Sequence, residues 1–209
     1  MKTDDLIHIL SCDGACKGPK PLAFVCFACL LVFTALTFFV LGFRAELIEM
    51  HPTIGFFAKT ALFGGIALWA AYALTQAAKP IGKPIHVKLA AACLVVLFAG
   101  ALAYEWLRVP AEVILRPFEN DTFPTCLVTV SAYGIIGTGI LLGYLKRFAP
   151  GNIRHAALLT GFCAVSFAAL GYSFHCSADG PTYIAVAYGL PALALVFLAS
   201  VIAPRFLRW

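Results

Sequence analysis

The chain has 209 residues, of which 62% are hydrophobic and only 12% are charged, and its formal net charge is +5. An ordinary soluble domain has roughly 25% charged residues. A water-soluble globular fold is therefore excluded, because polar side chains are too few to cover the apolar surface, and the excess must face lipid.

Six segments are long and apolar enough to cross a bilayer. A helix needs about 20 apolar residues to span roughly 30 Å of hydrocarbon, and it must be a helix because lipid offers the backbone no hydrogen-bond partners. The alternation over about ten residues that is typical of membrane β-barrel strands is absent. The sequence therefore predicts an all-α polytopic membrane protein, a six-transmembrane-helix bundle. Its spans are expected at 21–42, 54–78, 89–107, 125–145, 154–171 and 184–202.

Lysine and arginine are distributed unevenly over the connections between these spans. With the N-terminus inside, eleven of the fifteen basic residues lie in inner segments and four in outer ones. Because basic residues are enriched in cytoplasmic loops, both ends of the chain are predicted to be cytoplasmic. The four outer basic residues are then Arg44, Lys59, Arg108 and Arg116.

The first ten residues have the pattern of a short amphipathic helix. Leu6, Ile9 and Leu10 share one face, and Asp4 and Asp5 precede them, where acidic groups favour the start of a helix. A helix of about ten residues is marginal alone in water, so this one needs a surface. That surface is either the membrane or the bundle, or a groove on a soluble partner. The two acids mildly disfavour an anionic membrane.

The N-terminal segment is not expected to be a cleaved signal peptide. Its acidic residues do not suit the basic start of a signal peptide, and the first apolar stretch has the length of a span without a small-residue cleavage pattern. We therefore expect two parts. Residues 1–20 form a cytoplasmic N-terminal segment and linker, and residues 21–209 form the six-span domain.

Eight cysteines fall into three groups along the predicted topology. Cys12 and Cys16 lie behind the N-terminal helix on the reducing side, where the tail supplies too few further ligands for a metal site, and their role stays open. Four others lie within spans, where small polarizable packing residues are expected. They are Cys26, Cys29, Cys93 and Cys163.

Cys126 and Cys176 are the most informative pair. One opens the fourth span and the other follows the fifth, so both are expected at the outer surface, where antiparallel neighbouring helices can bring them together. An oxidising outer compartment makes a disulfide chemically reasonable. His175 adds an imidazole, and thiolates with imidazole suit zinc-like or softer metals. The pair is thus either a sensor of metal or oxidant, or a structural disulfide or two packed thiols.

Other motifs carry less information. Gly139 and Gly143 form a small-xxx-small pattern, which predicts close helix packing. Charged residues within the spans are nearly missing, and this disfavours a transporter. There is no phosphate loop, no nucleophile–base pair and no cofactor motif, so neither an enzymatic function nor a permanent cofactor is expected.

Four short motifs occur in order along the chain. They are Lys2-Thr3-Asp4-Asp5-Leu6-Ile7, Cys126-Leu127, Tyr172-Ser173-Phe174-His175-Cys176 and Arg205-Phe206-Leu207-Arg208-Trp209. With these motifs the chain resembles the NrsF-type family of six-span membrane anti-sigma factors of Gram-negative bacteria. The resemblance covers nearly the full length, whereas Cys12 and Cys16 depart from the family pattern.

The resemblance implies a location in the bacterial inner membrane and a regulatory function. Such proteins hold an extracytoplasmic-function sigma factor through their cytoplasmic N-terminal segment and do not contact nucleic acid directly. Carried onto this chain, Asp4, Asp5 and Leu6 would contact the sigma factor, and we infer that Ile9 and Leu10 complete the binding stripe. The oligomeric state stays open.

The resemblance also implies a signal. Heavy metal or oxidant outside the cell would act on Cys126 and Cys176 and release the sigma factor, with His175 as an auxiliary metal ligand. A soft or borderline metal ion would then be a signal and not a cofactor.

Two functions of other classes are weighed against the anti-sigma factor. A membrane thiol-disulfide oxidoreductase coupled to quinone would explain the many cysteines. It needs a reactive pair in one flexible outer loop, whereas Cys126 and Cys176 are fifty residues apart. A small-molecule or metal exporter is disfavoured by the lack of charge within the spans.

Overall fold

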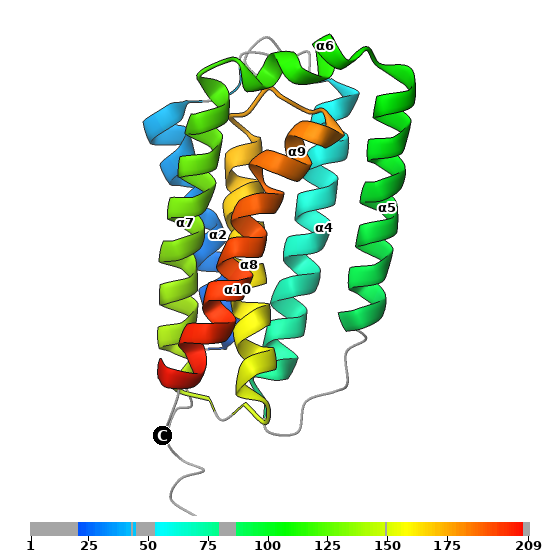
Figure 1. Ribbon diagram of the computed structural model, residues 1–209. Helices are drawn as coiled ribbons and strands as arrows, with labels where there is room; N and C mark the ends of the chain where they lie inside the picture. Colours follow the sequence, from blue (N-terminus) through cyan, green and yellow to red (C-terminus); the bar gives the residue numbers. More distant parts are fainter. Residues whose placement is uncertain (1–20, 43, 45–52, 80–86, 149, 207–209) are drawn as a thin grey trace, which may run out of the picture.

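The computed structural model describes residues 21–42, 44, 53–79, 87–148 and 150–206, and the regular structure in these ranges is helical throughout (Figure 1). The elements are α2 (Leu22–Leu41), α4 (Ile54–Ala77), α5 (Val87–Arg108), α6 (Ala111–Leu115), the 3-10 helix η2 (Arg116–Phe118), α7 (Thr122–Leu145), α8 (Ile153–Ser173), α9 (Pro181–Ala187) and α10 (Gly189–Phe206).

Six helical stretches are long and apolar enough to cross a membrane, and they confirm the predicted bundle. Each lies within a few residues of its predicted span. The predicted amphipathic helix, with Asp4, Asp5, Leu6, Ile9 and Leu10, lies outside the described residues. Its conformation therefore stays a prediction.

The sixth span is broken into α9 and α10 at Tyr188. Pro191 explains the break, because proline has no N–H to donate to the Ala187 carbonyl and its ring crowds that carbonyl. The span also begins earlier than predicted, at Pro181, where a proline is well tolerated in the first turn of a helix. The break turns α9 over the bundle near the end of α5 (Figure 1).

α8 is the central helix and contacts α2, α4, α7 and α10. In its apolar stretch 83% of the residues are buried, against none in α5. Glycines permit the closest approaches to α8. A Cβ at Gly161 would lie 3.1 Å from the Leu195 carbonyl oxygen of α10, and one at Gly171 would lie 3.2 Å from the Thr34 nitrogen of α2.

The predicted packing role of Gly139 and Gly143 is wrong for the described part of the molecule. A Cβ at either position would meet no atom within 4 Å, whereas Gly134 and Gly137 on the same helix face Leu195 and Phe33. α7 therefore packs through the face that carries Gly134 and Gly137. The spacing of the small residues indicates a smooth helix face but not which face turns inward.

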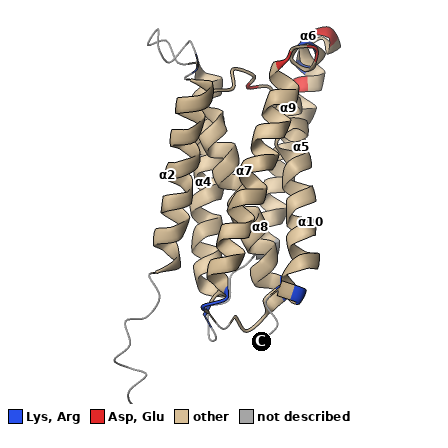
Figure 2. Ribbon diagram, turned by 90° about the vertical axis from the view of Figure 1, so that its left-hand side faces the viewer, with Lys and Arg blue, Asp and Glu red and all other residues tan. Residues whose placement is uncertain are grey.

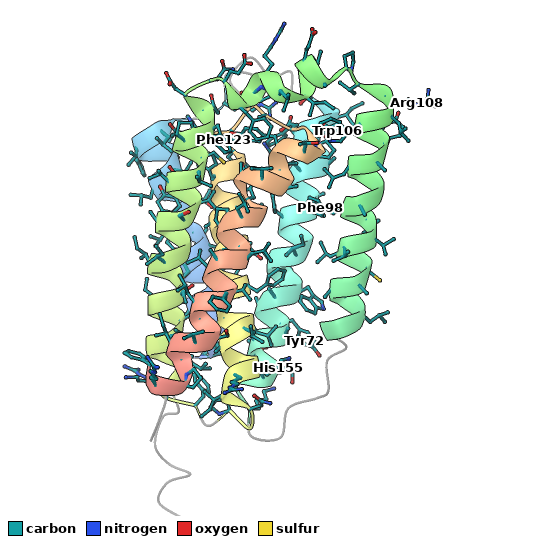
Figure 3. The ribbon with its side chains drawn as sticks, viewed as in Figure 1. Tyr72, Phe98, Trp106, Arg108, Phe123 and His155 are labelled. Carbon is teal, nitrogen blue, oxygen red and sulfur yellow. The ribbon has the colours of Figure 1, made fainter. Side chains whose placement is uncertain are left out.

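α5 lies at the edge of the bundle (Figure 1) and is joined to it mainly through α6 and α9. Glu105 accepts hydrogen bonds from the backbone nitrogen and the hydroxyl of Thr182, at 2.7 and 2.6 Å, and Trp106 donates to the same hydroxyl at 3.0 Å. Lower on the helix, Phe98 extends toward α4 (Figure 3). Most of the remaining surface of α5 is apolar and exposed, as expected of a lipid-facing helix.

The two ends of the bundle differ in charge (Figure 2). We call the end that carries α6 and the loop 174–180 the α6 end. Every acidic residue in the described ranges lies there, whereas the opposite end is basic. The acids are Glu105, Glu112, Glu119, Asp121 and Asp179, and the basic residues opposite include Lys79, Lys146, Arg147, Arg154 and Arg205.

Candidate functional site

The structure brings Cys126 and Cys176 together at the α6 end. Cys126 lies in the second turn of α7, and Cys176 follows α8, which packs antiparallel beside α7. Their side chains are in hydrogen-bonding contact as free thiols. Neither has exposed surface, so the expectation that they lie at the outer surface is wrong in this respect. They form a buried pair, which we call the thiol pair.

Three tyrosines surround the thiol pair. Tyr183 and Tyr188 are within hydrogen-bonding reach of both sulfurs, and Tyr183 also donates to the Thr122 carbonyl oxygen at 3.4 Å. Tyr172, one turn before Cys176, is fully buried. The Tyr172 and Tyr188 hydroxyls have no well-aligned hydrogen bond to any described residue. The thiols therefore sit in a buried site with spare hydroxyl donors, which sequence analysis did not identify.

A buried ionic network holds the loop that carries Cys176. Asp179 pairs with Arg44 at 2.9 Å and with Lys59 at 2.7 Å. Lys59 also donates to the carbonyl oxygens of Cys176 and Ala178, at 2.8 and 3.1 Å. Sequence analysis placed Lys59 within the second span, toward its outer end, and did not foresee its burial. It lies in α4 and its side chain is fully buried, because three oxygens of the loop replace its hydration.

Two groups in this loop have shifted pKa values. The hydrogen bond from the Cys126 thiol, supported by the Lys59 ammonium, lowers the pKa of Cys176 although burial opposes the shift. Burial raises the pKa of Asp179, but Arg44 and Lys59 outweigh it and lower that pKa below its ordinary value. Since the thiolate is the reactive form of cysteine, Cys176 is the expected nucleophile of the pair and Cys126 its partner.

His175 contacts the end of α2, where its Nδ1 lies 3.0 Å from the Gly42 carbonyl oxygen. Its ring also packs against Tyr172, with centroids 5.5 Å apart. Within the described ranges, no group of three or more His, Cys, Asp or Glu side chains is arranged to hold a metal ion. The role of His175 as an auxiliary metal ligand therefore stays a prediction.

The same loop is hydrogen-bonded to Arg44, which lies directly after α2. The Arg44 backbone N–H donates to the Phe174 carbonyl oxygen at 3.1 Å, and the Arg44 guanidinium donates to the Cys176 carbonyl oxygen at 3.4 Å and to both Asp179 carboxylate oxygens. Together with the His175 contact, these bonds connect the thiol pair to α2. The other end of α2 leads directly into residues 1–20.

The remaining described cysteines divide between packing and exposure. Cys26, Cys29 and Cys163 are buried, and Cys26 is in hydrogen-bonding contact with Cys163 between α2 and α8, which confirms that these three pack in the core. Cys93 is exposed on α5. Its predicted packing role is therefore wrong within the described molecule, because no residue in the apolar stretch of α5 is buried.

Comparison with known proteins identifies the family. Residues 16–209 match the family model described as "Negative regulator of sigma F". The chain is 26% identical to the "Probable anti-sigma-F factor NrsF" of Azospira oryzae and 24% identical to the "Anti-sigma-F factor NrsF" of Caulobacter vibrioides, with each protein covered over its full length. No solved structure matches the chain. The family is regulatory and not enzymatic, and the chain belongs to this family of negative regulators of sigma F.

Proposed function

We propose that the chain is a membrane anti-sigma factor that sequesters an extracytoplasmic-function sigma factor through its N-terminal segment. A thiol-oxidising or thiophilic metal signal at the thiol pair releases the sigma factor. The observation that carries the second half of this proposal is the direct bonding of the Cys176 loop to the end of α2. The family assignment supports the first half.

In the orientation we propose, the α6 end faces the periplasm and both termini face the cytoplasm of a bacterial inner membrane. The separation of charge supports this orientation, because the end opposite α6 is basic (Figure 2) and cytoplasmic ends of membrane proteins are enriched in lysine and arginine. The thiol pair then lies on the oxidising side, and residues 1–20 lie where a sigma factor is found.

The chemistry that we propose at the thiol pair needs no residue beyond the two cysteines. With an oxidant, Cys126 and Cys176 lose two protons and two electrons and form one sulfur–sulfur bond, while the oxidant gains the electrons. With a soft divalent metal ion, the two sulfurs lose their protons and bind the ion. A disulfide shortens the sulfur–sulfur separation to about 2.05 Å and pulls the Cys176 loop toward α7, whereas a bound metal ion resets that separation to its own coordination geometry.

α2 is the transmitting element in this proposal. The loop holds Gly42 and Arg44 at one end of α2, and residues 1–20 continue from the other end. A shift of the loop therefore displaces or tilts α2 and changes how the N-terminal stripe is presented. A tenfold loss of affinity requires only about 1.4 kcal/mol of differential stabilisation, which a disulfide can supply.

Co-purification of a sigma factor from detergent-solubilised membranes tests the partner. Intact protein under reducing conditions should capture an extracytoplasmic-function sigma factor. A protein lacking residues 1–10, and the variant Asp4→Ala, Asp5→Ala, should fail to do so while remaining folded. The variant Glu112→Ala is a matched control, because it removes acid at the opposite end of the bundle. Equal capture by the truncated protein would refute the binding role of the segment.

A further inference from the structure

The thiol pair has no exposed surface, although any reagent that modifies it must reach a sulfur atom. A route is therefore required at the α6 end. A cavity of about 220 Å³ lies there, between the segment formed by α6, η2 and the start of α7 and the loop residues Ser177 and Ala178. This volume is below that of pockets for drug-sized ligands, so the cavity suits a small molecule or ion.

Two residues that line the cavity also contact the groups at the thiol pair. Ala178 lines the cavity, and its carbonyl oxygen lies 3.8 Å from the Cys176 sulfur. Thr122 also lines the cavity, and its carbonyl oxygen accepts the hydroxyl of Tyr183, which contacts both sulfurs. A route from the cavity to the sulfurs would therefore pass these two contacts.

The polar lining of the cavity is rich in hydrogen-bond donors. Arg116 supplies a guanidinium, Asn120 an amide, and Thr122 and Ser177 supply hydroxyls. Arg116 forms no ion pair with another described residue, so its charge is available to a ligand. No acidic side chain lines the cavity, although Glu112, Glu119 and Asp121 belong to the same connecting segment.

We propose that this cavity is the entry and binding site for the oxidant form of the signal, and that it selects small anionic, thiol-reactive molecules through Arg116. The proposal rests on the proposed function in that it takes the thiol pair as the sensor. The inference adds two statements, namely where the signal molecule binds and that this molecule is an anion. Arg116 is a specificity-determining residue, since it lines the cavity and does not contact the sulfurs.

The test uses full-length protein in zwitterionic nanodiscs and two methanethiosulfonate reagents of similar size, the anionic sulfonatoethyl and the cationic trimethylammonioethyl forms. In each reaction the thiolate attacks the reagent sulfur, a mixed disulfide forms and methanesulfinate leaves. Peptide-resolved mass spectrometry gives the rate at Cys176, and the rates of the same two reagents with 2-mercaptoethanol, a neutral thiol free in solution, serve as the reference.

We expect the anionic reagent to modify Cys176 about fivefold faster than the cationic one at low salt, relative to their rates with 2-mercaptoethanol, with the preference reduced by salt. Arg116→Gln should abolish the preference. Arg108→Gln is the matched control, because Arg108 is exposed at the same end and points away from the bundle (Figure 3). It should leave the preference intact. Ser177→Trp should slow both reagents at Cys176 by filling the cavity.

Three outcomes would overturn the proposal. They are an unmodified Cys176 while both reagents react with 2-mercaptoethanol, the absence of an anionic preference in the unaltered protein, and equal loss of preference in the Arg116 and Arg108 variants. Because no sigma factor is present, these outcomes are independent of the proposed function. Failure to bind a sigma factor with normal charge selection at Cys176 would reject that function and leave the cavity assignment standing.

Discussion

At the scale of residues, the feature that distinguishes this bundle is a polar site built where the loop 174–180 meets the apolar core. Lys59, Arg44 and Asp179 are mutually paired, and the backbone carbonyls of the loop accept most of the remaining donors. Charged groups near a membrane core persist only when paired or solvated. The network thus fixes the position of Cys176 against Cys126.

Lys59→Met tests the structural contribution of the network. The substitution keeps a long apolar side chain but removes the Lys59 donor from the Ala178 carbonyl oxygen and from part of the Asp179 carboxylate, and it leaves the Cys176 carbonyl oxygen only its 3.4 Å bond from Arg44. Since Arg44 remains, we expect a loss of about 2–3 kcal/mol in the free energy of unfolding. Thermal unfolding in detergent measures it, with exposed Lys79→Met as the control. Equal stability of the two variants would contradict the assigned role of Lys59.

The pH dependence of stability tests the charge on Asp179. Its pKa is lowered from an ordinary value of 3.8. The folded state therefore favours the carboxylate. This stabilisation is fully present above the ordinary value and is lost as the pH falls through the lowered pKa of the folded protein. The difference in unfolding temperature between the unaltered protein and Asp179→Asn should be constant from pH 7 to about pH 5 and shrink toward pH 3. A constant difference down to pH 3 would refute the assignment.

At the scale of elements, α8 organises the bundle and small residues set how closely its neighbours approach. Gly161 is the clearest case, because a Cβ there would lie 3.0 Å from the Ala199 Cβ, 3.1 Å from the Leu195 carbonyl oxygen and 3.2 Å from the Val196 Cα of α10. Two of these atoms belong to the backbone, which cannot move aside as a flexible side chain can. The contact between α8 and α10 therefore depends on glycine at this position.

Gly161→Val should destabilise the protein by about 2 kcal/mol through overpacking. Gly139→Val is its matched control, since no atom lies within 4 Å of a Cβ there. The control should unfold within a few degrees of the unaltered protein. Thermal unfolding of both variants in the same detergent provides the comparison. A larger effect at Gly139 than at Gly161 would mean that α7 packs through its other face.

The sequence predicts the number and type of elements because apolar length is a local property that each span carries by itself. It also predicts that Cys126 and Cys176 meet, since topology alone places both at one end of neighbouring helices. What it misses depends on how each helix is rotated. The burial of Lys59, the tyrosines around the thiols and the outward face of Gly139 are all decided by rotation. When a helix is apolar on every face, its hydropathy does not indicate which face turns toward the core.

At the scale of the whole molecule, the account requires that the α6 end and the two termini lie on opposite sides of the membrane. Reporter fusions test this requirement. Alkaline phosphatase should be inactive after Trp209 and active when inserted after Glu112 in α6, whereas green fluorescent protein should be fluorescent only after Trp209. The reverse pattern at both sites would invert the orientation and place the thiol pair in the reducing cytoplasm.

The central claim is that a change at the thiol pair alters binding at the other end of the bundle. The most direct measurement is the affinity of full-length protein in nanodiscs for its sigma factor, before and after a thiol oxidant, with Cys126→Ser, Cys176→Ser as the comparison. The account predicts that oxidation weakens binding at least tenfold in the unaltered protein. It also predicts that the double variant binds normally and does not respond. Undiminished release from the double variant, or unchanged affinity of the unaltered protein once its Cys126–Cys176 disulfide has formed, would contradict the account.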